Sequence, residues 1–78
     1  MSRRKLQALP DAKAIGRRVR EIRGFDLNQR EFAALLGVGQ QAISKIEKGD
    51  GLPSIELLLK LKEYSGRSID WLLTGQVV

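Results

Sequence analysis

Apolar residues recur at helical spacing in successive segments of this chain. Ile15, Val19 and Ile22 follow one another at intervals of four and three, which places them on one face of a helix. The segments 29–36 and 40–48 repeat this spacing on either side of a short glycine-containing interruption. The pattern therefore predicts one helix ending near residue 23, followed by two short helices that lie close together in sequence.

Residues that favour helix starts precede each predicted helix. Asp11 stands before the first, and Asn28 with Glu31 has the spacing of a capping box before Gln29. Ser54 and Ser68 stand before two further apolar segments and are expected to cap a fourth and a fifth helix. No segment alternates apolar and polar residues as a half-buried strand would. The sequence predicts an all-α fold of five helices.

The apolar residues outside the first three helices are expected to complete one core. Several lie in the fourth predicted helix, two lie in the loop after the first helix, and the indole of Trp71 closes the base of the bundle. An alternative for Tyr64, Leu72 and Leu73 is a dimer surface. The residues expected to face inward are Phe25, Leu27, Ile55, Leu58, Leu59, Leu61, Tyr64 and Trp71.

The turn between the second and third helices indicates a function. Gly37 and Gly39 can adopt conformations that tighten the turn, and Val38 between them can enter the core. The face of the third helix opposite its apolar stripe carries amide, hydroxyl and ammonium groups and no carboxylate. Two short helices joined in this way are typical of a helix-turn-helix, whose second helix enters the DNA major groove. The residues of that polar face are Gln40, Gln41, Ser44, Lys45 and Lys48.

Composition narrows the class of protein. Its 78 residues are enough for one small domain and one core. The absence of cysteine and histidine removes disulfides, the usual metal ligands and the usual general base, so we expect no enzyme activity, cofactor or metal site. No apolar run approaches the ~18 residues of a membrane span. We expect a soluble, cytoplasmic, nucleoid-associated protein without an evident small-molecule ligand.

Positive charge is concentrated in the first part of the chain. Residues 1–30 hold nine Lys and Arg against three Asp and Glu, whereas residues 31–78 hold five against six. Such an imbalance is expected where one side of a domain contacts phosphates, although solvated helix surfaces produce it too. Residues 1–10 are expected to form a flexible basic arm, and residues 11–76 the helix-turn-helix domain.

Five segments of this chain resemble the helix-turn-helix repressor and Cro superfamily of lambdoid phages. They read IGRRVREIR, LNQREFAALLGV, QQAISKIEKG, LPSIELLLKL and SIDWLLTG, and together they run from about Ile15 to Gly75. The resemblance implies a five-helix DNA-binding domain. Two differences stand out, since Gly39 replaces the usual Ser or Thr cap of the recognition helix, and the loop before Gln29 is one residue shorter than in many members.

The resemblance also implies roles for individual residues. A glutamine pair such as Gln40–Gln41 reads bases in family members, and Lys45 lies one turn beyond on the same face, where it reaches a base or a phosphate. An arginine and a glutamate at the positions of Arg23 and Glu47 form an ion pair that orients the recognition helix. The expected contacts to the DNA backbone come from Asn28, Gln29, Ser44, Lys48 and Arg18.

These observations predict a sequence-specific double-stranded DNA-binding regulator, of repressor type, acting as a homodimer on a pseudo-palindromic operator. An antitoxin of this fold that also binds a toxin is one alternative. A protein-interaction module is another, although the polar face of the third helix lacks the aromatic or aliphatic residues on which such modules usually depend.

Overall fold

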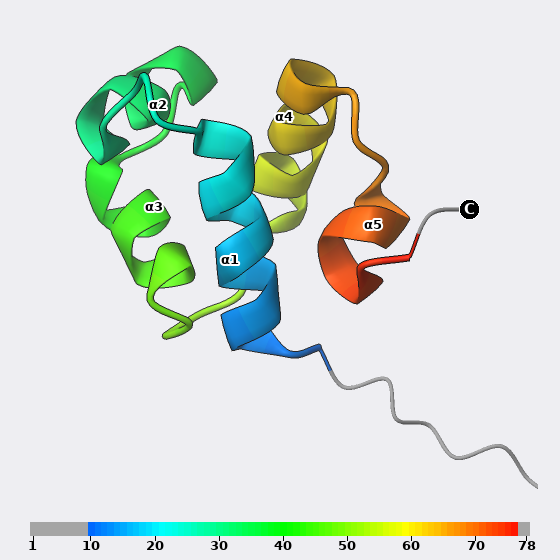
Figure 1. Ribbon diagram of the computed structural model, residues 1–78. Helices are drawn as coiled ribbons and strands as arrows, with labels where there is room; N and C mark the ends of the chain where they lie inside the picture. Colours follow the sequence, from blue (N-terminus) through cyan, green and yellow to red (C-terminus); the bar gives the residue numbers. More distant parts are fainter. Residues whose placement is uncertain (1–9, 77–78) are drawn as a thin grey trace, which may run out of the picture.

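The computed structural model describes residues 10–76, and within them the chain forms five α-helices and no strand. Figure 1 shows them as α1 (Ala12–Arg23), α2 (Gln29–Leu36), α3 (Gln40–Glu47), α4 (Ile55–Ser65) and α5 (Ile69–Thr74). The predicted all-α, five-helix fold is confirmed. Residues 1–9, which hold nearly all of the expected basic arm, lie outside the described range.

Four helices begin at the capping residues that the sequence indicated. The side chains of Asp11, Ser54 and Ser68 each accept a hydrogen bond from the backbone N–H three residues later. Asn28 Oδ1 accepts from the N–H of Glu31 at 2.8 Å, and Glu31 Oε1 accepts from the N–H of Asn28 at 2.9 Å. This reciprocal pair satisfies two amide groups that a helix start leaves without partners.

The core forms around α1, which lies between α3 on one side and α5 on the other (Figure 1). Ile15 and Val19 of α1 are fully buried, as predicted, and Ile22 is half-buried. Each of the other helices contributes at least one fully buried side chain to the same cluster. These are Phe32 of α2, Ile43 of α3, Leu61 of α4 and Leu72 of α5.

The C-terminal apolar residues divide between core and surface. Trp71 is buried, as predicted, and Leu72 is completely buried, so Leu72 belongs to the core and is not available to a dimer surface. Leu73 is half-buried against the core. Tyr64 is 46% exposed, and its ring packs edge-on against Phe32 with centroids 5.6 Å apart.

The inward face of α4 differs from the prediction. Leu57 and Leu61 are the buried residues, and Leu58 is half-buried, but Ile55 and Leu59 are 77% and 51% exposed. Positions 57 and 61 are one turn apart and define the face toward the core, whereas 55 and 59 lie on nearly the opposite side. The expectation that Ile55 and Leu59 face inward was wrong, because α4 holds more aliphatic residues than its core face accepts.

Phe25 also lies where the sequence did not predict it. Gly24 ends α1 with a φ of 74°, which turns the chain away, and the ring of Phe25 is fully exposed. Leu27 instead packs against the core, as expected. The loop is short, and Leu27, directly before the Asn28 cap, takes the position at the core.

Within residues 10–76, the helices are too short and too polar for any of them to cross a membrane.

Candidate nucleic-acid interface

The turn between α2 and α3 is closed by backbone hydrogen bonds. Gly37 ends α2 in the left-handed conformation with φ 72°, which glycine adopts without the steric cost that other residues incur. The N–H of Val38 donates to the carbonyl of Ala33 at 2.9 Å, and the Val38 side chain packs against the core. Gly39 then begins α3 without a side-chain cap. The turn therefore holds α3 against α2 through its backbone and through one buried side chain.

The two faces of α3 differ as the sequence predicted. Ile43 and Ile46 are buried in the core. Gln40, Gln41 and Lys45 are exposed, and an added Cβ on Gly51 would lie 3.7 Å from Lys45 Cδ. The stem of Lys45 therefore lies against the connection between α3 and α4. Ser44 is half-buried beside this face, and Lys48 is exposed at the end of the helix.

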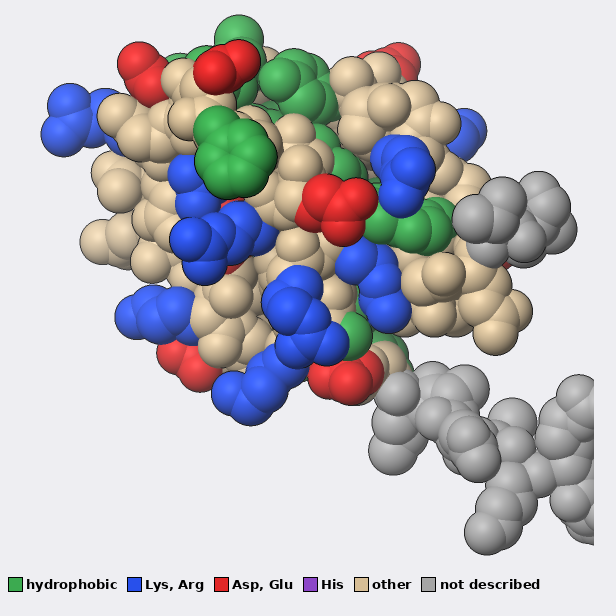
Figure 2. Space-filling view, viewed as in Figure 1, with side chains coloured by type: hydrophobic (Ala, Val, Ile, Leu, Met, Phe, Trp, Pro, Cys, Tyr) green, Lys and Arg blue, Asp and Glu red, His purple; other side chains and the backbone are tan. Residues whose placement is uncertain are grey.

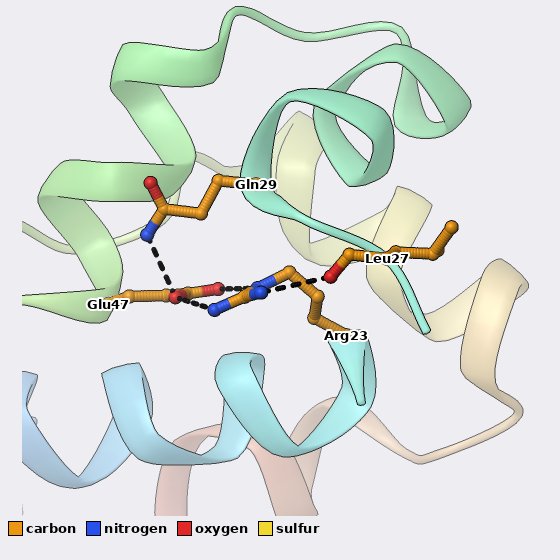
Figure 3. Close-up of polar contacts among 4 residues, drawn as sticks. All are labelled: Arg23, Leu27, Gln29 and Glu47. Atoms are coloured by element: carbon orange, nitrogen blue, oxygen red, sulfur yellow. Dashed lines mark hydrogen bonds and ion pairs between the residues drawn. The ribbon is translucent and has the colours of Figure 1, made fainter. Parts of the chain in front are cut away.

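Glu47, the last residue of α3, is bound from two other segments (Figure 3). Arg23 at the end of α1 donates from Nε to Oε2 and from Nη2 to Oε1, both at 2.9 Å. Gln29 at the start of α2 donates from Nε2 to Oε1 at 3.0 Å. The third nitrogen of the guanidinium, Nη1, donates to the carbonyl of Leu27 at 3.0 Å. The cluster ties α1, the following loop and α2 to the C-terminal end of α3.

The Arg23–Glu47 pair is shielded from solvent, with side chains 14% and 5% exposed. Burial by itself would raise the pKa of Glu47, but the hydrogen bonds from Arg23 and Gln29 outweigh it, so the pKa lies below its ordinary value. The positive charges of Arg23 and Arg20 also lower the pKa of Glu47. The hydrogen bond to Glu47 in turn raises the pKa of the Arg23 guanidinium. The expected ion pair is present, and Gln29 joins it as a third member.

Gly16 sets the distance between α1 and α3. It is buried in the middle of α1, and a Cβ added there would collide with the carbonyl oxygen of Ile46 and lie 3.0 Å from that of Glu47. A side chain at this position would push α3 away from α1. Sequence reasoning missed this residue. The available signal was a glycine inside an otherwise regular helix, where it costs about 1 kcal/mol relative to alanine.

Arg18 lies on the α5 side of α1. Its Nη1 donates to the carbonyl of Leu72 at 3.0 Å, and an added Cβ on Gly75 would lie 2.6 Å from Nη2. The structure does not bring Arg18 together with the residues of α3. Besides Arg23, Arg20 is an α1 cation whose charge acts on Glu47, and sequence reasoning did not select it.

A shallow hollow lies where the starts of α2 and α3 meet the end of α1. Its volume is about 490 Å³, and it brings together Asn28 and Gln29 from the sequence prediction. The side chains around it donate hydrogen bonds or carry positive charge, and no carboxylate lines it. The lining residues are Arg23, Asn28, Gln29, Arg30 and Gln40. The face over α1 in Figure 2 likewise gathers Lys and Arg side chains, interspersed with a few carboxylates.

Comparison with known proteins agrees with this geometry. Residues 17–72 match the model of a Helix-turn-helix family. The chain is 39% identical over 59 residues to the HTH-type transcriptional regulator YgzD of Bacillus subtilis, which covers 70% of this chain and 89% of that protein. It is 43% identical over 47 residues to an HTH-type transcriptional regulator of Haemophilus influenzae, but spans only 20% of that relative's length.

Among solved structures, the chain resembles the P22 c2 repressor protein, crystallised in complex with a synthetic operator. The TM-score is 0.71 at 33% identity, and the match covers 80% of this chain and 96% of the repressor chain. Residues 17–72, which the family model matches, include the glycine turn, the α3 face and the Glu47 cluster. The chain belongs to the Helix-turn-helix family.

Proposed function

We propose that this chain is a transcriptional regulator of repressor type that binds a specific DNA sequence by placing α3 in the major groove. The observation that carries the proposal is the exposed face of Gln40, Gln41 and Lys45 on a helix whose opposite side is fixed in the core. The similarity to a repressor crystallised with its operator supports the same function. A regulator of this kind lowers transcription by occupying promoter DNA.

The side chains of this face suit the reading of base edges. A glutamine carboxamide donates and accepts at once, so Gln40 and Gln41 can each pair with N6 and N7 of adenine. Lys45, exposed on the same face, can donate to O6 and N7 of guanine. Ser44 is half-buried at the edge of the face, and its hydroxyl is a proposed donor to a phosphate.

The hollow at the starts of α2 and α3 is the proposed phosphate site. The N-terminal end of α2 carries partial positive charge, and Gln29 and Asn28 stand at that end. Arg30 adds a full charge from the same rim, whereas the charge of Arg23 is balanced by Glu47. Lys48 at the other end of α3 is a further backbone contact. Arg18 is not part of this proposal, because it bonds to α5.

One copy of α3 has eight residues and can read only a short run of base pairs. Useful specificity therefore requires two copies related by a two-fold axis, on half-sites about one helical turn of DNA apart. We propose a homodimer on a pseudo-palindromic operator for this reason.

The test is selection from random duplexes of about 30 base pairs at near-physiological salt with excess competitor DNA. Enrichment of one motif in two inverted copies is the expected result. Binding without enrichment, lost at moderate salt, would show charge attraction alone and would refute the proposed reading of bases.

A further inference from the structure

Three large aliphatic side chains stand on the surface where α4 begins. Leu52 precedes α4 and is 52% exposed, Ile55 is 77% exposed, and Leu59 one turn later is 51% exposed. Ile55 and Leu59 each lie two residues from a core leucine, about 200° away around the helix. The side of a surface helix that faces away from the core is normally polar. Below, these three residues are called the α4 patch.

We infer that the α4 patch is the surface through which two copies of this chain associate. The inference rests on the proposed function, since binding to two half-sites requires two copies held in a fixed relation. It differs from the alternative considered for Tyr64, Leu72 and Leu73, in which these residues form a dimer surface, because Leu72 is completely buried in the core.

Charge favours a second copy as the occupant. The whole chain carries a net charge of +5, and its cations gather before residue 31, so two copies meeting through α1 would repel each other. Residues 52–63, in contrast, hold two glutamates and two lysines and no net charge. Glu56 and Lys60 already form an exposed pair at 3.5 Å. A neutral surface that carries both signs is compatible with the self-complementary contact that two-fold symmetry requires.

The position of the patch suits two recognition helices on one duplex. The N-terminal end of α3 borders the phosphate hollow, where Gln40 meets the start of α2. The C-terminal end of α3 leads through the connection at Gly51 to Leu52, so the patch begins beyond that opposite end. Two copies joined through the patch turn the C-terminal ends of their α3 helices toward the two-fold axis and their phosphate hollows away from it.

The size of the patch sets the strength of the contact. A stable protein interface usually buries about 800 Å² on each partner and some 20–30 residues a side, and three aliphatic residues form only the centre of such a surface. The association is therefore weak without DNA and becomes effective when adjacent half-sites hold two copies side by side. Cooperative binding to two half-sites is the expected sign of this contact.

The experiment compares the double variant Ile55→Glu/Leu59→Glu with the wild type on duplexes that carry one or two copies of the selected half-site. Both variant positions are exposed, so folding should be retained, which circular dichroism checks. We expect unchanged affinity for one half-site and an at least tenfold weaker, non-cooperative binding to two, on the order of the gain that linked binding provides. Leu35→Glu, at a residue that is 60% exposed on α2, is the matched control and should behave as the wild type.

Cooperativity that survives in the double variant would overturn the inference. If the wild type selects no DNA sequence, the proposed function fails. Sedimentation equilibrium at about millimolar protein then tests, without DNA, whether two copies associate through the α4 patch. Association that is lost in the double variant but kept in Leu35→Glu would support the α4 patch. A wild type that stays monomeric, or a double variant that still associates, would refute it.

Discussion

Replacing Glu47 by glutamine tests how strongly the recognition helix is anchored. Glutamine has nearly the same shape, so Glu47→Gln removes the charge and replaces one acceptor oxygen with an NH₂ group. That group would face a donor nitrogen of Arg23 or of Gln29, both of which now donate to the carboxylate. The guanidinium, whose side chain is only 14% exposed, would lose its charged partner.

The magnitude follows from this geometry. Removing one partner of a buried ion pair costs roughly 3–5 kcal/mol, because the other charge stays buried without compensation. Arg23 keeps its hydrogen bond to the carbonyl of Leu27, and glutamine keeps one acceptor, so we expect the lower end, about 3 kcal/mol. A domain of this size has a total stability of about 4–12 kcal/mol. The loss should lower the melting temperature by roughly 12–24 °C.

Urea unfolding followed by circular dichroism measures the effect, with the slope of the transition as a check that both proteins unfold alike. Glu56→Gln is the matched control. It also removes a glutamate that pairs with a cation, Lys60, but the side chain of Glu56 is 78% exposed. Exposed pairs of this kind contribute at most about 1 kcal/mol. If Glu47→Gln lost no more stability than Glu56→Gln, the Arg23–Glu47–Gln29 cluster would not be an anchor of α3.

Three further results are expected. Gly16→Ala should destabilise the domain by about 1–3 kcal/mol in the same urea assay, because the new methyl group would collide with a backbone carbonyl of α3. If the variant were instead more stable, as the higher helix propensity of alanine alone would make it, the close packing of α1 on α3 would be contradicted. Because the pKa of Glu47 is lower in the folded than in the unfolded protein, its stabilising effect is complete above the ordinary glutamate pKa and is lost as the pH falls through the folded value. Unfolding between about pH 5 and pH 2 should therefore depend less on pH in Glu47→Gln, and parallel curves would refute this assignment. Gln40→Ala and Gln41→Ala should each cost about 1–3 kcal/mol of binding free energy on the selected site and less on random DNA, whereas Lys48→Ala should weaken both alike. Equal losses on the selected site and on random DNA for both glutamine variants would contradict base reading.

Local signals in the sequence were sufficient for the helices and for most of the core. Capping residues such as Asn28 and Ser68 act on the backbone N–H groups that directly follow them, so their effect does not depend on distant parts of the fold. The spacing of Ile15, Val19 and Ile22 is equally local, since only one face of α1 contains large aliphatic residues. Where a segment offers one apolar face, periodicity identifies the buried side.

The same reasoning fails where a segment offers more than one apolar face. Five of the seven residues from 55 to 61 are Ile or Leu, so several registers of α4 would each bury a plausible set. The rotation of α4 about its own axis decides which set is buried, and this rotation depends on the contacts of α4 with α2 and α5. Leu57 and Leu61 became core residues, while Ile55 and Leu59 were left on the surface as part of the α4 patch.

In the candidate site, the type of a residue is known from the sequence, but the direction of its side chain depends on the packing of the helices. The sequence predicts which residues can contact DNA, but Arg18 and Arg20 are two positions apart, about 200° around α1, and both lie off its apolar stripe. The Leu72 carbonyl of α5 accepts a hydrogen bond from Arg18, whereas the charge of Arg20 acts on Glu47 of α3. Gln29 joined the ion pair because the start of α2 meets the end of α3, a contact between residues 18 positions apart.

The position of α3 is fixed by contacts that lie away from its exposed face. Its N-terminal end has no side-chain cap, and its position depends on the backbone turn after Gly37, on the close approach at Gly16 and on the bonds to Glu47. None of these contacts uses the side chain of Gln40, Gln41 or Lys45. Substitutions on that face should therefore change the DNA sequence that is read without loss of stability, whereas substitutions in the three anchors should weaken binding to every sequence.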